Sequence, residues 1–435
     1  MEEAKTNRWF IAIMGTTLQL CLGTVYAWSY FQKPLCDTYK WSNTQVAWAF
    51  SLAICFLGLA AAWGGIKLPK LGPRKLAMMG GALFGIGYLL GALALHLQSL
   101  PLLYIGYGVI GGSGLGLGYV TPVATVSKWF PDKPGFSTGM VVMGFGFGAL
   151  LMSKFIAPFL MDMTGKNLVT VFAYMGVLFL VLTLPVGYAL KNPPAGYVPA
   201  GWTPPATAAG AAKADESLTV RESVTSGRFA IIWLIFFCNI AAGISIIDFQ
   251  SPLMQDRLAA ADPTMTKEAL AAGGATLIAI TSLFNGVGRF FWGGLSDRIG
   301  RSRAFMLMLG TQIVAFGLLL VTANPWLFGA IFCYVLLCYG GGFGTMPAFI
   351  RSVFGARLQG AVYGTVLTAW SIAGIVGPQV VAFIKDKWKD PAQASQYSFM
   401  AAIAFIAVGF LLTFIAKDTA FASKAAAAPE ASKAA

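Results

Sequence analysis

Long apolar runs separated by short polar stretches make up most of the chain between residues 9 and 417. Each run has about 20 residues, the length that an α-helix needs to cross a bilayer core. Strands of a membrane β-barrel would have about 10 residues of alternating polarity, a pattern that these runs lack. The pattern predicts an all-α membrane protein with twelve transmembrane helices, at 9–31, 44–65, 75–96, 101–127, 134–161, 170–190, 228–250, 269–295, 304–322, 326–350, 360–385 and 397–417.

The helices fall into two sets with the same order of features. Residues 191–227 are rich in Pro, Gly and Ala, which is typical of a linker. On either side, GLGYVTPVATVSKWFPDKPGFSTGM and GFGTMPAFIRSVFGARLQGAVYG place glycines, a proline, a basic residue and an aromatic in the same order. We predict two pseudo-symmetric six-helix halves, 1–190 and 228–417, with a substrate site between them. Residues 418–435 are of low complexity, and we expect a disordered cytoplasmic tail.

The composition excludes a water-soluble protein and a nucleic-acid partner. Hydrophobic residues make up 57% of the chain and charged residues 11%, against about 25% charged in an ordinary soluble domain. The net charge is +13, but the basic residues are scattered through loops instead of being gathered on one face with aromatics. Most of them lie on the side of both termini and the linker, which predicts a multi-pass protein of the cell's inner membrane with both termini cytoplasmic.

The sequence offers no constellation for an enzyme or a cofactor. The six cysteines have no CxxC or Cys/His spacing, so we expect no metal. The GLGLG stretch at 114–118 follows no strand and is not a nucleotide loop. Paired acids or a nucleophile with its base are not visible at midplane, and neither are the repeated charge rings of a channel. We therefore expect a monomeric carrier without a cofactor that works in the lipid bilayer.

Two basic residues lie well inside apolar runs, Lys154 and Arg289. A charge within a membrane is costly and points to function. Arg289 falls near the middle of its helix and shares a face with Asn285, and a guanidinium can hold a carboxylate through two parallel hydrogen bonds. We predict that both residues bind an anionic substrate; a structural arginine paired to backbone carbonyls is the alternative. For Lys154, snorkelling to the interface is as good an explanation as substrate contact.

Aromatic residues of four helices are candidates for the cavity wall. Tyrosine hydroxyls can donate to a carboxylate while rings pack against its carbon chain. For each residue alone, ordinary helix packing explains the aromatic equally well. The candidates are Tyr26, Tyr119, Tyr339, Phe343 and Trp370.

Asp248 is the one acidic residue near the interior of an apolar run, at the outer end of helix 228–250. A desolvated carboxylate can take up a proton near neutral pH, as a proton-coupled carrier requires. We predict Asp248 as the proton-coupling candidate. A helix-end aspartate wetted by the next loop is the alternative.

The loop after the eighth helix reads GGLSDRIGRSR and resembles the loop motif of the major facilitator superfamily. Charges at a helix end, a tight glycine turn and flanking arginines suit a loop that holds neighbouring helix ends together. The pseudo-equivalent loop, GGIKLPKLGPRK, has Pro69 in place of the aspartate, so we expect the first-half contact to be weakened. The residues of this conformational loop motif are Gly293, Asp297, Arg298, Gly300 and Arg301.

Within that superfamily, five segments resemble the oxalate/formate antiporter family and the neighbouring monocarboxylate transporters. The resemblance implies the twelve-helix major facilitator fold, transport of small carboxylates by alternating access, and an anion-binding arginine at position 289. The segments are NRWF at 7–10, GTVYAWSYF at 23–31, KWFPDKPG at 128–135, NPPAGYVPAGW at 192–202 and NGVGR at 285–289.

Two departures from the family pattern bear on the substrate and the coupling. Oxalate antiporters of this family carry a lysine in helix 11 where this chain has Trp370, which favours a monocarboxylate such as lactate, acetate, formate or pyruvate. Monocarboxylate transporters usually have an aspartate where this chain has Asn285, so proton symport and anion exchange both remain open. An oxalate/formate-type dicarboxylate exchanger and a non-transporting carboxylate sensor of the same fold are the alternatives.

Overall fold

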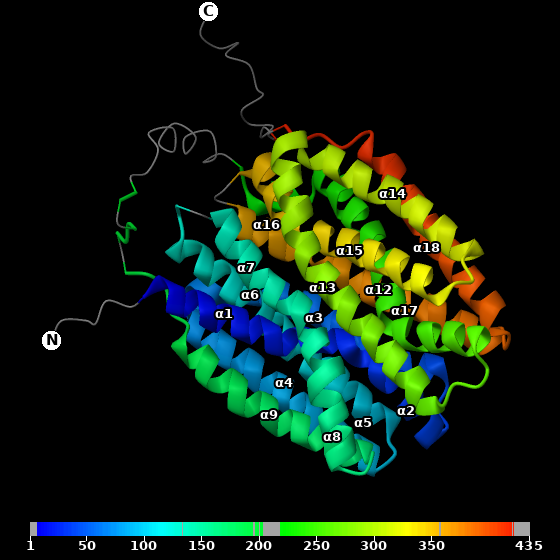
Figure 1. Ribbon diagram of the computed structural model, residues 1–435. Coiled ribbons are helices and arrows are strands. Elements are labelled where there is room, and N and C mark those ends of the chain that lie inside the picture. The colour runs from blue at the N-terminus through cyan, green and yellow to red at the C-terminus, as the bar shows by residue number, and fades with distance from the viewer. Residues whose placement is uncertain are drawn as a thin grey trace, which may run out of the picture.

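The computed structural model describes residues 7–132, 134–194, 196–199, 201–202, 218–355, 358–419 and 421, and within them every long element is a helix (Figure 1). Twelve helices are long and apolar enough to cross a membrane, as predicted. Those of the first half are α1 (Arg8–Gly23) with η1 (Thr24–Ala27) and α2 (Trp28–Tyr39), α3 (Asn43–Leu71), α4 (Pro73–His96), α5 (Leu100–Leu103) with η2 (Tyr104–Gly111) and α6 (Gly112–Trp129), α7 (Pro134–Leu151) with η3 (Met152–Ile156) and α8 (Ala157–Met163), and α9 (Leu168–Ala189).

The second half repeats the arrangement after a short helix, α11 (Val220–Val224). Its spans are α12 (Gly227–Ala261), α13 (Lys267–Ile299), α14 (Arg301–Val321), α15 (Pro325–Phe354), α16 (Gln359–Val366) with α17 (Thr368–Lys387), and α18 (Pro391–Thr413). In Figure 1 the first half, blue to blue-green, lies to the lower left and the second half, green to red, lies to the upper right. The halves approach each other where α3 packs against α17 and where α7 packs against α13.

The predicted helix ends differ from the structure where polar residues continue a helix beyond its apolar run. The first span reaches Tyr39 instead of residue 31, and α12 reaches Ala261 instead of residue 250. The last span begins at Pro391, because Asp390 caps it by accepting a hydrogen bond from the Ala392 amide and proline suits the first turn. Hydropathy marks the membrane-embedded part of each helix, whereas these ends are fixed by caps.

Part of the predicted disordered tail is in fact bound to the second half. The Asp418 carboxylate accepts a hydrogen bond of 2.9 Å from the Ser302 amide at the start of α14. The Phe421 amide donates to the Val353 carbonyl oxygen at 2.8 Å. The expectation of disorder from residue 418 onward is therefore wrong for these residues, since a carboxylate at a helix N-terminus is stabilised there. Residues 422–435 and the linker residues 203–217 lie outside the described part of the chain.

The two halves meet along seams where glycines bring backbones together. A Cβ on Gly58 of α3 would lie 2.2 Å from the Ser371 hydroxyl oxygen of α17. A Cβ on Gly146 of α7 would lie 2.7 Å from Gly286 Cα of α13. Small residues permit such close approach between membrane helices. Of the helices that pack together at these seams, α7, α13 and α17 also supply residues of the central site.

We expect Gly288→Ala to destabilise the second half. A Cβ at this position of α13 would lie 2.0 Å from the Leu337 carbonyl oxygen of α15, so the helices must move apart. Overpacking of this kind costs about 1–3 kcal/mol. Gly294→Ala is the matched control on the same helix, because nothing lies within 4 Å of its added Cβ. Thermal unfolding in detergent measures both; a Gly288→Ala melting temperature at or above that of Gly294→Ala contradicts this account.

Candidate functional site

Six buried aromatic rings from both halves meet at the centre of the molecule, and we call them the central cage. They include all five predicted aromatics. Trp370 of α17 is the common neighbour: its ring centroid lies 5.3 Å from that of Tyr119, 4.6 Å from that of Phe343 and 5.9 Å from that of Phe145. The six residues are Tyr26, Tyr119, Phe145, Tyr339, Phe343 and Trp370.

Helix 1 is broken where it enters the cage. The 3₁₀ segment η1 carries Tyr26, and the preceding Gly23 lies so close to α7 that a Cβ would be 2.0 Å from the Phe145 carbonyl oxygen. This approach sets the Tyr26 ring 5.2 Å from the Phe145 ring. The Tyr26 and Tyr339 hydroxyls share a hydrogen bond of 2.8 Å, which joins the two halves inside the cage.

Arg289 of α13 supplies an uncompensated positive charge to the cage. Its side chain is 2% exposed, and Nε, Nη1 and Nη2 all lack a hydrogen-bond partner. The guanidinium carbon lies 5.0 Å from the Phe343 ring centroid, a cation–π contact. Because the backbone carbonyls do not pair with this arginine, the alternative of a structural arginine is not supported. A buried charge without a partner is costly, so the geometry calls for an anion.

Neutral polar groups near the arginine are also without partners. The Tyr119 hydroxyl and the Trp370 Nε1 are buried and unpaired. Asn285, one turn before Arg289 on the same helix, is 2% exposed and its Oδ1 has no partner. Two neutral donors and one full positive charge thus lie among the rings of the central cage, a combination that suits a single carboxylate.

The central cage is closed off from solvent in this conformation, because Arg289 and the six rings are each at most 2% exposed. The cavity beside Asn285, which also touches Tyr26, Gln250 and Thr281, has a volume of about 10 Å³. A single water needs about 10–15 Å³. A carboxylate therefore cannot reach Arg289 in this conformation unless the surrounding helices move.

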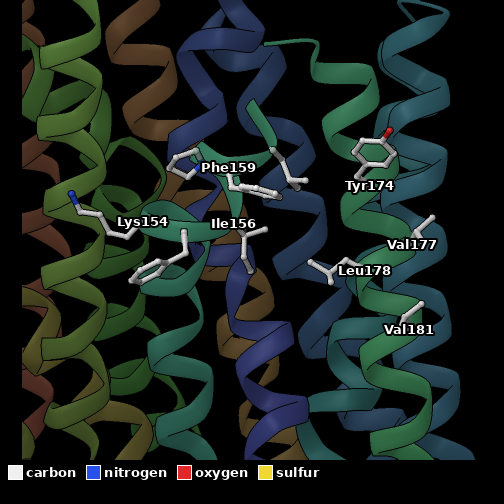
Figure 2. Close-up of a pocket in the computed structure, with 10 residues that line it drawn as sticks. Lys154, Ile156, Phe159, Tyr174, Val177, Leu178 and Val181 are labelled. Atoms are coloured by element: carbon white, nitrogen blue, oxygen red, sulfur yellow. The ribbon is translucent and has the colours of Figure 1, made fainter. Parts of the chain in front are cut away.

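Lys154 lies outside the central cage. It belongs to the π-helical segment η3, is exposed, and donates a 2.6 Å hydrogen bond from Nζ to the Thr276 hydroxyl of α13. Lys154 is one of the residues that line an apolar groove of about 900 Å³, together with Phe159 and Tyr174, and Figure 2 shows its Nζ on the side away from Tyr174. These groove side chains are exposed and suit contact with lipid. The predicted substrate contact of Lys154 has no support in this geometry.

Asp248 is buried inside α12, and the alternative of a wetted helix end is wrong. The helix continues beyond it to Ala261, and the Asp248 side chain is 0% exposed. Both carboxylate oxygens lack a hydrogen-bond partner. The sequence placed the residue at a helix end because the apolar run stops at residue 250. Proton coupling through Asp248 stays a prediction.

The loop motif joins the end of α13 to the start of α14. Gly300 adopts φ +92° between the two helices, a conformation that favours glycine. Arg301 donates a hydrogen bond to the Asp297 carboxylate across this turn. Arg298 is exposed, and a Cβ on Gly293 would lie 3.5 Å from the Gly344 carbonyl oxygen of α15. Since the Asp297 side chain is 65% exposed, the ion pair orients the turn more than it stabilises the fold.

Phe145 is the cage residue that the sequence analysis missed. It lies in the GFGFG stretch at 144–148, whose glycines permit close approach of helices. An aromatic between glycines at a helix crossing is the signal that was available. The same close approach that needs the glycines turns the Phe145 ring toward Tyr26 and Tyr119.

Comparison with known proteins agrees with the fold and with the resemblance found in the sequence. The chain is 26% identical over 417 residues to the oxalate:formate antiporter of Oxalobacter formigenes, which covers 94% of this chain and 91% of that protein. It is 25% identical over 390 residues to monocarboxylate transporter 11 of Mus musculus, covering 86% and 79%. The solved structure of a D-xylose-proton symporter superposes with a TM-score of 0.71 at 14% identity, covering 95% and 99%. The predicted fold class and the family resemblance are confirmed.

The sequence model of one transporter superfamily also matches this chain, over residues 9–378. That stretch contains every residue of the central cage and Arg289. The twelve membrane helices and the two-half architecture fit the same class. The chain therefore belongs to the Major Facilitator Superfamily of membrane transporters.

Proposed function

We propose that this chain transports small monocarboxylates across the cell's inner membrane by alternating access to the central cage, with both termini in the cytoplasm. The observation that carries the proposal is the buried, unpaired Arg289 guanidinium inside an aromatic cage built by both halves. Because the two halves of one chain suffice to build the cage, we propose that the carrier works as a monomer. Two relatives named for small carboxylates support the same substrate class.

Charge balance favours a monocarboxylate over oxalate. Arg289 is the one cation in contact with a ring of the cage among the described residues. A monoanion neutralises it, whereas a dianion would leave one carboxylate in a low-dielectric site facing only neutral donors. The Trp370 Nε1 and the Tyr119 hydroxyl are such donors.

Uptake into proteoliposomes tests the proposal. Labelled lactate, acetate, formate and oxalate are offered with and without an inward proton gradient. We expect uptake of at least one monocarboxylate and little uptake of oxalate. Oxalate as the best substrate would support a dicarboxylate exchanger instead. Binding of a monocarboxylate without flux would support a sensor, and both results contradict the proposal.

Symport and exchange are distinguished through Asp248. A monoanion on Arg289 makes a neutral pair, so exchange needs no titratable residue, whereas symport needs a carried proton. If the carrier is a symporter, we expect Asp248→Asn to remove acceleration by an inward proton gradient while exchange of labelled for unlabelled substrate continues. Asp262→Asn, at the exposed end of the same helix, is the control. A mutant that still concentrates substrate from acidic medium shows that Asp248 does not carry the proton.

A further inference from the structure

The outer end of the seam between α3 and α17 holds a carboxylate that crosses from one half to the other. Asp386, at the end of α17, accepts hydrogen bonds from the first residues of α3. The donors are the Asn43 amide at 3.2 Å, the Asn43 Nδ2 at 3.3 Å, the Thr44 amide at 3.0 Å and the Thr44 hydroxyl at 2.5 Å. A negative charge at a helix N-terminus is stabilised by the unpaired amides and the helix dipole.

This contact is not the ordinary cap of α3. Ser42 accepts a hydrogen bond from the Gln45 amide, and the Gln45 side chain accepts one from the Ser42 amide, so α3 has a complete capping box of its own. The capping box leaves the Asn43 and Thr44 amides without partners, and the Asp386 carboxylate accepts a hydrogen bond from each of them. It is 343 residues away from Asn43 in the chain and belongs to the other half.

The neighbouring Lys385 does not form its ion pair with the Asp386 carboxylate. Lys385 pairs with Asp256 of α12 at 3.0 Å, within its own half. Farther along the seam, the Gln379 Nε2 donates a 3.3 Å hydrogen bond to the Ser51 hydroxyl of α3. The polar contacts between the two helices thus run inward from Asp386, and they must break before these helix ends can separate.

At the opposite end of α3, the described residues make no comparable contact. Pro69 stands there where the loop motif of the superfamily has an aspartate. A Cβ on Gly65 would lie 4.0 Å from the Gly360 carbonyl oxygen of α16, an approach without charge. Among the residues that the structure describes, no side-chain hydrogen bond joins α3 to α16. Within that described part of the chain, the charged contact between these parts of the two halves is the one at Asp386.

We propose that Asp386 is the latch of the external gate: its carboxylate on the N-terminus of α3 holds the outer ends of the two halves together and biases the carrier against opening outward. This inference rests on the proposed function, from which it takes the orientation of the chain in the membrane and the existence of an external gate. It assigns a gating role to a residue that does not touch the central cage.

Distances between spin labels test the latch without any substrate. The labels are placed on Thr38→Cys in α2 and Ala261→Cys in α12, both exposed positions in different halves, with Cys36 and Cys55 replaced by serine. We expect one short distance in the otherwise unchanged protein. Loss of one hydrogen bond to a charged group changes an equilibrium constant by about tenfold or more. Asp386→Asn should therefore raise the ratio of long to short distances by about tenfold.

Matched variants make the result decisive. Asp390→Asn is the control, since Asp390 caps only its own helix four residues farther on. Thr44→Val removes one donor and keeps the carboxylate, so it should shift the ratio in the same direction by a smaller factor, and it serves as the test if Asp386→Asn does not fold. A distance distribution equal to that of Asp390→Asn overturns the latch. Failure of carboxylate transport with the expected shift in distances would instead contradict the proposed function alone.

Discussion

Replacing Arg289 with lysine is expected to lower carboxylate transport by about 100-fold or more while leaving the protein folded. A lysine ammonium keeps the charge but cannot make the two parallel hydrogen bonds that a guanidinium makes with a carboxylate. Truncating one partner of a buried, hydrogen-bonded charge pair costs about 2–5 kcal/mol, and 2.7 kcal/mol is about 100-fold. Initial rates of labelled monocarboxylate exchange in proteoliposomes measure the loss.

Arg303→Lys is the matched control for this substitution. Arg303 is exposed on α14 and lies outside the central cage, so its replacement should leave transport unchanged. Arg289→Ala separates binding from stability: it removes a buried charge that has no hydrogen-bond partner, so the melting temperature without substrate should stay the same or rise. Transport by Arg289→Lys at the wild-type rate would show that the arginine does not hold the substrate.

The second large effect is expected at Trp370, where Trp370→Lys should turn the preference from monocarboxylates toward oxalate. Trp370 is 0% exposed and contacts Tyr119 and Phe343 in the cage. A lysine in its place would give the site a second positive charge, which pairs with the second carboxylate of oxalate. We expect the ratio of oxalate to monocarboxylate affinity to rise by about tenfold or more. Competition of unlabelled oxalate against labelled monocarboxylate measures that ratio.

Trp370→Gln distinguishes charge from lost packing. Glutamine removes the indole ring without adding a cation, so it should weaken monocarboxylate binding and leave oxalate binding weak. Equal gains in oxalate affinity for the glutamine and lysine variants would mean that space, not charge, excludes oxalate. Tight competition by oxalate in the unchanged protein would show that the inference from position 370 is wrong.

The number and order of the membrane helices were predictable because burial in lipid requires continuous apolar runs, and each run appears in the sequence. Helix ends were less predictable. The extension of α12 to Ala261 passes through polar residues that a hydropathy pattern treats as a loop, yet their amides continue the helical hydrogen bonds. The same error made Asp248 look like a helix-end residue when it is buried.

The site could be predicted only in part, because its members come together through tertiary packing. Arg289 was identifiable alone, since a charge in the middle of an apolar run is costly wherever the helix packs. Each aromatic was ambiguous until contacts such as Tyr119 with Trp370 were known. Lys154 is also a basic residue inside an apolar run, but its side chain is exposed at the surface and donates a hydrogen bond to Thr276. Asp386 lies between Lys385 and Lys387, and nothing in the sequence alone distinguishes it from other charges at a helix end.

The measurement that tests the central claim most directly is thermal stabilisation of the purified protein by carboxylates. A ligand that binds only the folded state raises the melting temperature with its concentration. Lactate, acetate and formate are compared with chloride at equal ionic strength, for the unchanged protein and for Arg289→Ala. We predict that at least one monocarboxylate, but not chloride, raises the melting temperature of the unchanged protein and that Arg289→Ala shows no rise. An equal rise in Arg289→Ala, or none with any monocarboxylate in the unchanged protein, would contradict an anion site at Arg289.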